Sequence, residues 1–160
     1  AGHFENMTVD DVTGMIDLNC KALAAITHIS LPYMSGPSNI INLASSAAFL
    51  PQPSFAIYAA SKSMVLSFSR ALGRELEGRG ITVTAVCPGP VKTEFFDIAQ
   101  KYTKSKPYKM VLRADPVKVV KLALFDAYYM SGVSVYSPLM KAFRIVCKYL
   151  PHSLLIKFMK

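Results

Sequence analysis

The sequence predicts an α/β domain built on a parallel sheet, and two observations lead to this fold class. Short apolar or β-branched runs alternate with longer segments of helical periodicity, in the order strand, helix, strand, helix. The runs are apolar at most positions, as expected for strands that are covered on both faces. The 160 residues, of which 52% are hydrophobic and 18% charged, suffice for one folded domain with one core.

The first helix is expected over about residues 8–31. Thr8 can cap its N-terminus, and the two aspartates that follow suit the positive end of the helix dipole. A turn rich in Ser, Gly and Pro occupies residues 35–38. The next segment, residues 39–44, is short and mostly apolar, and we therefore expect it to form the first buried strand.

A second long helix is expected over residues 55–76, followed at 77–80 by a segment with two glycines that ends it. Residues 81–86 are rich in β-branched side chains and are predicted to form the second buried strand. The Pro-Gly-Pro sequence at 88–90 ends this strand. Strand, helix and strand together form a unit that favours parallel pairing.

The C-terminal third begins with residues 94–112, whose mixed charges and aromatic side chains indicate a loop with short helical pieces. A helix is predicted from 116 to about 130, with Asp115 as its cap and a proline in its first turn. A short third strand is expected at residues 132–136. We thus assign residues 1–136 to the sheet domain.

Residues 137–160 form the second part, an amphipathic basic helical tail interrupted near Pro151. The net charge of +8 is concentrated towards this end, because residues 101–160 hold twelve basic and only two acidic side chains. The tail either packs on the domain or a partner subunit, which we favour, or rests on an anionic membrane surface. Nucleic-acid binding is not expected, since no stacking platform or reading helix accompanies the basic residues.

The cysteines indicate neither a disulfide framework nor a metal site. They are three, far apart, without a Cys-x-x-Cys or Cys/His spacing, so buried or free thiols are expected. No apolar run approaches the ~20 residues needed to span a bilayer, and the first residues lack the features of a signal peptide. We therefore expect a cytoplasmic protein. The cysteines are Cys20, Cys87 and Cys147.

One pair of residues indicates acid/base chemistry. Tyr58 and Lys62 are four residues apart and share one face of the second predicted helix. A phenol with a pKa of about 10 shuttles protons poorly at neutral pH, and an adjacent ammonium favours the phenolate. Such a tyrosine can protonate a carbonyl oxygen as hydride arrives. The same spacing at Tyr102 and Lys106 lies in a lysine-rich loop and is interpreted as a solvated surface.

Two strand ends support this interpretation. Ser45 follows the first buried strand, thirteen residues before Tyr58, and its hydroxyl can hold a substrate oxygen at the carboxyl edge of the sheet. The adjacent Ser46 is the alternative, but the spacing favours Ser45. After the second strand, Gly89 permits close backbone approach and Thr93 offers a hydroxyl to a ligand.

Together these segments resemble the short-chain dehydrogenase/reductase family over nearly the whole chain. Ala1-Gly2 is similar to the end of the family's Asn-Asn-Ala-Gly element, and Asp17-Leu18-Asn19 to the helix segment that carries its catalytic Asn. Residues 42–45 are similar to its serine strand, and residues 58–62 to its Tyr/Lys helix. Residues 88–93 resemble the loop that touches the nicotinamide. The order and spacing of these elements make the match specific.

The resemblance implies a role for each of four residues. Tyr58 is then the general acid/base, and Lys62 lowers its pKa and binds the nicotinamide ribose. Ser45 orients the substrate oxygen, and Asn19 holds a water that links Lys62 to solvent. The cofactor is NAD or NADP. The residues expected to contact it are Gly2, Tyr58, Lys62, Pro88, Gly89, Val91 and Thr93.

The resemblance also implies a partial Rossmann-like, doubly wound parallel sheet of three C-terminal strands with flanking helices. The family's N-terminal half is missing, and with it the glycine-rich turn and the residue that chooses between NAD and NADP. We therefore expect a fragment with little or no dehydrogenase activity alone. The alternative is a non-catalytic binding or scaffold protein that retains a truncated form of the fold.

Substrate and assembly follow from the same resemblance. Residues 94–112 correspond to the family's variable lid, and their aromatic side chains favour an apolar carbonyl or alcohol substrate, unless they only pack the lid down. In this family the helices that carry Asn19 and Tyr58 pair subunits, so homo-oligomers are expected.

Overall fold

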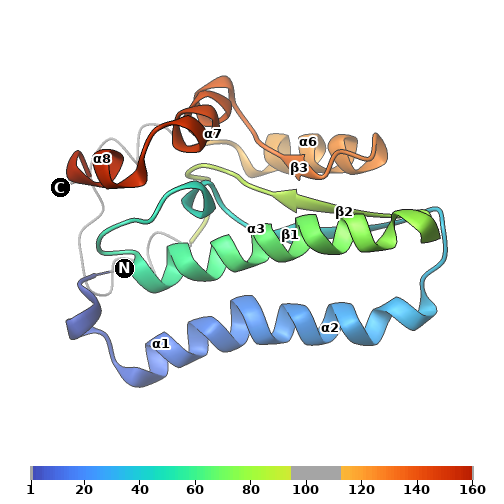
Figure 1. Ribbon diagram of the computed structural model, residues 1–160, viewed down its shortest axis with the longest axis horizontal. Helices are drawn as coiled ribbons and strands as arrows, with labels where there is room; N and C mark the ends of the chain where they lie inside the picture. Colours follow the sequence, from blue (N-terminus) through green and yellow to red (C-terminus); the bar gives the residue numbers. More distant parts are fainter. Residues whose placement is uncertain (1, 95–112, 160) are drawn as a thin grey trace.

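The computed structural model describes residues 2–94 and 113–159, which form a three-stranded parallel sheet with helices on both faces (Figure 1). The strands β1 (Ser38–Leu43), β2 (Ile81–Val86) and β3 (Val133–Ser134) lie side by side in that order. The parallel α/β architecture predicted from the strand–helix order is thus confirmed. Because parallel strands end at the same edge, the loops after β1 and β2 lie next to each other.

One face of the sheet is covered by α3 (Ala56–Leu76), which packs against β1 and β2. Val65 and Ser69 of this helix are fully enclosed. The helix ends in a short 3₁₀ turn, Glu77–Arg79, and Gly80 follows with a positive φ of 66°. A glycine meets this left-handed conformation without steric cost, so the predicted stop after α3 has its physical basis here.

A second layer lies outside α3 and is a nearly continuous rod (Figure 1). It consists of α1 (Val9–Ile16), a π-helical segment (Asp17–Ala22) and α2 (Leu23–Ser30). The predicted cap is present, since the Thr8 hydroxyl accepts a hydrogen bond from the Asp11 N–H at 3.1 Å. The predicted single helix therefore exists, but its hydrogen-bonding pattern widens in the middle.

The opposite face of the sheet carries α6 (Pro116–Tyr128), which packs on Val86 of β2. α7 (Pro138–Tyr149) and α8 (His152–Lys157) follow β3 and pack against residues of the sheet and of α3. Asp115 caps α6 as predicted, accepting hydrogen bonds from two backbone N–H groups. β3 is shorter than the predicted 132–136 and pairs with only the last two residues of β2. Of the expected lid, only Glu94 belongs to the described residues. Among these residues, no helix has the length and hydropathy needed to cross a membrane.

The main core lies between the sheet, α3 and the C-terminal helices. Met140, Phe143 and Cys147 of α7 contribute to it, and Phe143 meets Phe49 with the two ring centroids 6.5 Å apart. Phe49 belongs to the 3₁₀ turn η4 (Ser46–Phe49), which follows β1. The tail predicted at residues 137–160 therefore packs on the sheet domain through one of its faces.

Candidate active site

The loop after β1 brings Ser45 to the N-terminal end of α3. Ser45 caps η4, because its Oγ accepts a hydrogen bond from the Ala47 N–H at 3.1 Å. The Ser46 N–H donates to the Pro88 carbonyl oxygen at 2.8 Å and so ties the loop after β1 to the loop after β2. The Ser45 side chain also hydrogen-bonds the phenol of Tyr58. The expected meeting of the strand-end serine with the helix tyrosine is therefore present.

The acidity of Tyr58 differs from the sequence-based expectation. Burial raises the pKa of Tyr58 above its ordinary value, and the hydrogen bond from Ser45, which favours the phenolate, only partly offsets it. The Lys62 Nζ lies 5.9 Å from the centroid of the Tyr58 ring. We expected Lys62 to hold the pKa of Tyr58 below its ordinary value. The pKa is instead above that value, because desolvation of the phenolate is the largest effect.

Lys62 lies at the edge of the sheet. Its Nζ donates a hydrogen bond to the Leu43 carbonyl oxygen, the last of β1, at 2.8 Å. Burial lowers the pKa of Lys62, and its electrostatic interaction with Cys20 raises it. The ammonium is therefore held beside Tyr58 at the carboxyl end of β1, where open α/β sheets bind their ligands.

Asn19 reaches the tyrosine helix through a residue that the sequence analysis did not select. Its Nδ2 donates to the Ser61 Oγ at 3.0 Å, and the Ser61 hydroxyl donates to the Tyr58 carbonyl oxygen at 2.8 Å. Ser61 is 3% exposed. Asn19 lies within the π-helical segment, and such widened turns are frequent at functional sites. The signal for Ser61 was its place between Tyr58 and Lys62 on the buried side of the helix.

The loop after β2 passes close to α7. A Cβ atom added at Gly89 would lie 2.8 Å from the Met140 Sδ, so this glycine makes room for the approach of the helix. Val91 forms an isolated parallel bridge with Ala114, and Thr93 is exposed just beyond it. The residue that lies against Gly89 is thus Met140, which is absent from the sequence-based set, and the contact between Gly89 and a cofactor stays a prediction.

The remaining predicted residues lie around the same edge. Gly2 is buried, and its N–H donates to the Ser54 carbonyl oxygen at 2.8 Å, which fixes the start of the chain next to the loop before α3. Pro88 accepts the bond from the Ser46 N–H described above. Within the described ranges, no three His, Cys, Asp or Glu side chains are grouped to hold a metal ion.

The cysteines of the described residues are free thiols. Cys87 directly follows β2 and is completely buried beneath α7. Burial raises the pKa of Cys87 to about 12, although the nearby Arg144 guanidinium pulls it down. This thiol stays protonated at neutral pH and therefore serves packing.

The arrangement combines a proton-carrying phenol, a hydroxyl bonded to it and an ammonium beside it, all at the carboxyl end of β1. Such a set can orient a substrate oxygen and exchange a proton with it. Asn19 joins the group through Ser61. The catalytic roles of these residues stay a prediction.

Comparison with known proteins gives a consistent picture. The family described as short chain dehydrogenase matches residues 1–103. Sulfoacetaldehyde reductase 2 of Chromohalobacter salexigens is 38% identical over 94 residues, which are 57% of this chain and 37% of that protein. Human dehydrogenase/reductase SDR family member 4 is 32% identical over 131 residues, which are 75% of this chain and 47% of that protein. The chain thus spans less than half the length of either relative.

Solved structures share the fold over most of the chain. A short-chain dehydrogenase/reductase from Burkholderia phymatum in complex with NAD matches with a TM-score of 0.75 and 20% identity, over 91% of this chain and 60% of that one. A short-chain dehydrogenase from Sphingobium yanoikuyae in complex with NADPH matches with a TM-score of 0.72 and 26% identity, over 94% of this chain and 61% of that one. The architecture is therefore common to these proteins despite low identity.

Proposed function

This chain belongs to the short-chain dehydrogenase family, and on that premise we propose that it carries the catalytic groups of an oxidoreductase. The reaction is transfer of a hydride between a nicotinamide cofactor and a carbonyl or alcohol group. The observation that supports it most is the hydrogen bond between Ser45 and Tyr58 at the carboxyl end of β1, with the Lys62 ammonium beside the tyrosine ring.

The described residues fit a nicotinamide dinucleotide, either NAD or NADP. Lys62 presents a positively charged donor at the sheet edge, and Thr93 presents an exposed hydroxyl after β2. We assign Lys62 to the ribose, and assign the loop from Pro88 to Thr93, with Gly2, to the nicotinamide side. Relatives crystallised with NAD and NADPH support this choice of cofactor. The chemistry that such a cofactor supplies when bound is hydride transfer.

The side chains of this chain supply the proton that the reaction needs. Because its pKa is raised, Tyr58 is protonated at neutral pH and can give its proton to a carbonyl oxygen. Ser45 holds that oxygen beside the phenol through its hydroxyl. Asn19 is assigned to the water that reconnects Lys62 with solvent, and its bond to Ser61 holds its side chain near the turn that carries Tyr58.

We further propose that the 160 residues alone have little or no dehydrogenase activity. The chain spans 37% and 47% of the two relatives described above. Within the described part of the chain, the edge of β1 away from β2 has no strand partner. Turnover by the isolated 160-residue chain at the rate of a complete family member would contradict this proposal.

Substitution of Tyr58 by Phe tests the proposed chemistry. In a polypeptide that contains this chain and turns over carbonyl compounds, Tyr58→Phe should lower kcat about 10²- to 10⁴-fold, because the proton donor is lost. The matched control is Tyr33→Phe, since Tyr33 is 88% exposed. Activity is followed by nicotinamide absorbance, and folding by circular dichroism. Undiminished reduction by folded Tyr58→Phe protein would contradict the role proposed for Tyr58, whereas absence of turnover in the unsubstituted polypeptide would favour the non-catalytic binding protein.

Substrate, assembly and location extend the proposal. The aromatic residues of the predicted lid favour an apolar substrate, although 95–112 lie outside the described residues. Pairing of subunits through the helices that carry Asn19 and Tyr58 is supported by exposed apolar side chains of the outer rod, among them Leu18, Ile26 and Ile29. A cytoplasmic location is supported by the free thiols. Size-exclusion chromatography with light scattering would measure the oligomeric state.

A further inference from the structure

The outward surface of α7 and α8 combines exposed apolar and basic side chains. The inward surface is used for packing, because Met140, Phe143 and Cys147 join the main core. Residues 137–160 contain no Asp or Glu. We call the following exposed residues the outer face: Leu139, Ile145, Tyr149, Leu150, Leu154 and Phe158, together with Lys141, Lys148 and Lys157.

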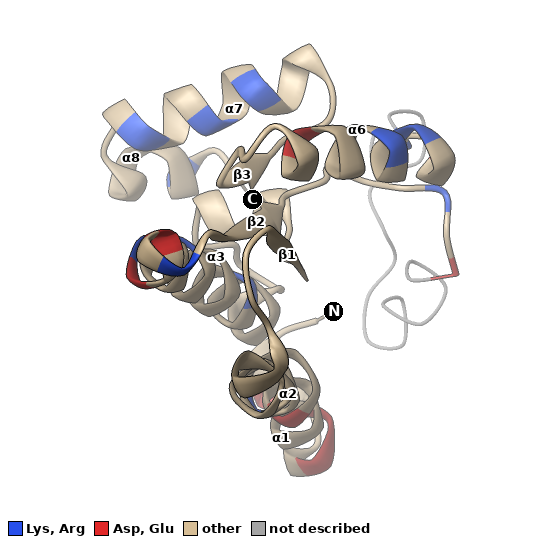
Figure 2. Ribbon diagram, turned by 90° about the vertical axis from the view of Figure 1, so that its right-hand side faces the viewer, with Lys and Arg blue, Asp and Glu red and all other residues tan. Residues whose placement is uncertain are grey.

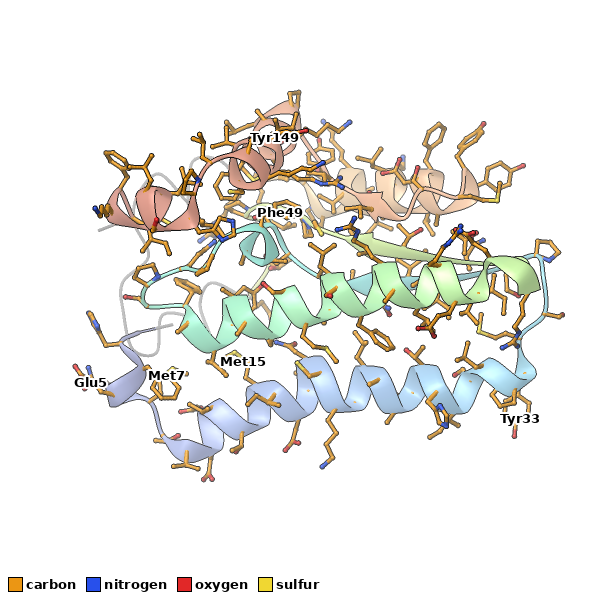
Figure 3. All side chains as sticks on the ribbon, in the orientation of Figure 1. Glu5, Met7, Met15, Tyr33, Phe49 and Tyr149 are labelled. Atoms are coloured by element: carbon orange, nitrogen blue, oxygen red, sulfur yellow. The ribbon has the colours of Figure 1, made fainter. Side chains whose placement is uncertain are left out.

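Two aromatic residues project most from the outer face. Tyr149 is 72% exposed and Phe158 is 82% exposed. Figure 3 shows Phe49 beneath α7, where it meets Phe143, whereas Tyr149 belongs to the exposed side chains of this helix. The Lys148 Nζ lies 5.3 Å from the centroid of the Tyr149 ring. An aromatic ring beside an ammonium is a pairing suited to a lipid–water interface.

We propose that the outer face docks on the surface of an anionic lipid bilayer, with α7 and α8 lying in the plane of the interface. The apolar side chains would enter the boundary between headgroups and acyl chains, and the lysines would remain among the headgroups. Each basic side chain close to an anionic surface adds to the attraction. This inference is independent of the proposed dehydrogenase chemistry.

Charge favours a lipid surface over a second copy of the chain. In a two-fold dimer, the same patch meets itself, so the basic residues of one outer face would oppose those of its copy. No acidic residue of 137–160 is available to neutralise them. An anionic bilayer supplies the opposite charge over the whole face.

The distribution of charge in the rest of the molecule supports the same orientation. Figure 2 shows basic residues on α6 and α7, with an acidic residue, Asp126, also on α6, and acidic residues on α1 at the opposite end of the molecule. Lys118 and Lys121 of α6 are exposed and extend the basic region beyond the outer face. An anionic surface would therefore attract the α6–α8 side and repel the α1 side.

Vesicle co-sedimentation tests the proposal with the full 160-residue chain. The chain should sediment with vesicles of phosphatidylcholine and phosphatidylserine, and much less with phosphatidylcholine alone. The double variant Lys141→Gln, Lys148→Gln should weaken partitioning roughly thirtyfold. The control variant Lys21→Gln, Arg70→Gln removes the same charge from exposed positions on the other helices and should bind as the unmodified chain does.

A fluorescent reporter can locate the contact. The chain has no Trp, so Tyr149→Trp introduces a single indole in the outer face. Its emission should shift to shorter wavelength when phosphatidylserine vesicles are added, because the ring enters a less polar environment. The matched variant Tyr33→Trp, in the short 3₁₀ turn after α2, should show no shift.

Three results would overturn the proposal. The first is equal sedimentation with neutral and anionic vesicles. The second is unchanged binding by the Lys141→Gln, Lys148→Gln variant. The third is a change of oligomeric mass, without loss of vesicle binding, in a Tyr149→Ser, Phe158→Ser variant measured by light scattering. This last result would assign the outer face to a second copy of the chain.

Discussion

Two helices of the core, α3 and α7, differ in the contacts that hold them. Both bury apolar side chains, but α3 also makes buried polar contacts: Ser69 accepts a hydrogen bond from Asn42 of β1 at 2.9 Å, and Ser61 bonds Asn19 of the outer rod. α7 is held by apolar and aromatic contacts, such as the pair of Phe143 and Phe49. Hydrogen bonds fix an orientation, whereas apolar burial supplies free energy with little directional demand. The helix that carries Tyr58 is therefore the directional one.

The largest expected effect comes from removing the Phe49 ring, against which α7 packs. Phe49→Ala should lower the free energy of unfolding by about 3–5 kcal/mol, because a buried ring and its contacts are lost. Urea unfolding followed by circular dichroism measures the change. Phe125→Ala, at a site 58% exposed, is the control, and a similar cost there would contradict the proposed difference.

The burial of the Cys87 thiol beneath α7 can be tested through the pH dependence of stability. The folded-state pKa is about 12, above the ordinary value near 9. Between pH 9 and pH 12 the thiol of the unfolded chain ionises while the buried thiol stays protonated. The stabilising contribution of the Cys87 thiol to the folded state is therefore fully present below pH 9 and is lost as the pH rises towards 12. Relative to Cys87→Ala, the unmodified chain should lose stability by up to roughly 1.4 kcal/mol per pH unit in this window. Equal slopes for both proteins in urea titrations would contradict the burial of this thiol.

Two serines of α3 offer the finest test. Ser61 and Ser69 are 3% and 0% exposed, and each meets the side-chain nitrogen of an Asn. Both Ser→Ala changes should cost about 1–3 kcal/mol of stability, because an amide loses its partner.

In an active polypeptide that contains this chain, only Ser61→Ala should also lower kcat, on the order of tenfold, since it frees the turn that carries Tyr58. An equal fall in kcat for folded Ser69→Ala would show that general loosening of α3 is the cause.

Local signals in the sequence predicted most of the fold. The caps Thr8 and Asp115 and the positive-φ Gly80 mark element ends, and each depends on residues nearby in the chain. β3 was predicted to be longer than it is, because the length of a strand depends on its pairing partner. β2 and β3 pair over only two residues of each strand.

Only those residues of the candidate site that are indicated by their spacing along the chain were predictable. Tyr58, Lys62 and Ser45 follow from helix and strand periodicity. The bond between Asn19 and Ser61 joins residues 42 positions apart, so no local pattern indicates it. The direction of the Tyr58 pKa was predicted wrongly, because a sequence shows a charged neighbour but not the extent of burial.

The π-helical segment Asp17–Ala22 has a consequence for insertions and deletions in this part of the chain. A widened turn accommodates about one extra residue within a helix, and each α-helical residue turns the chain by about 100°. Deleting one residue from this segment would remove the widened turn and leave an unbroken α-helix in which α1 and α2 keep nearly their present faces towards α3. Deleting a residue from α1 or α2 would instead rotate part of the rod by roughly that angle, so the widened segment is the place in this rod where a one-residue deletion is tolerated best.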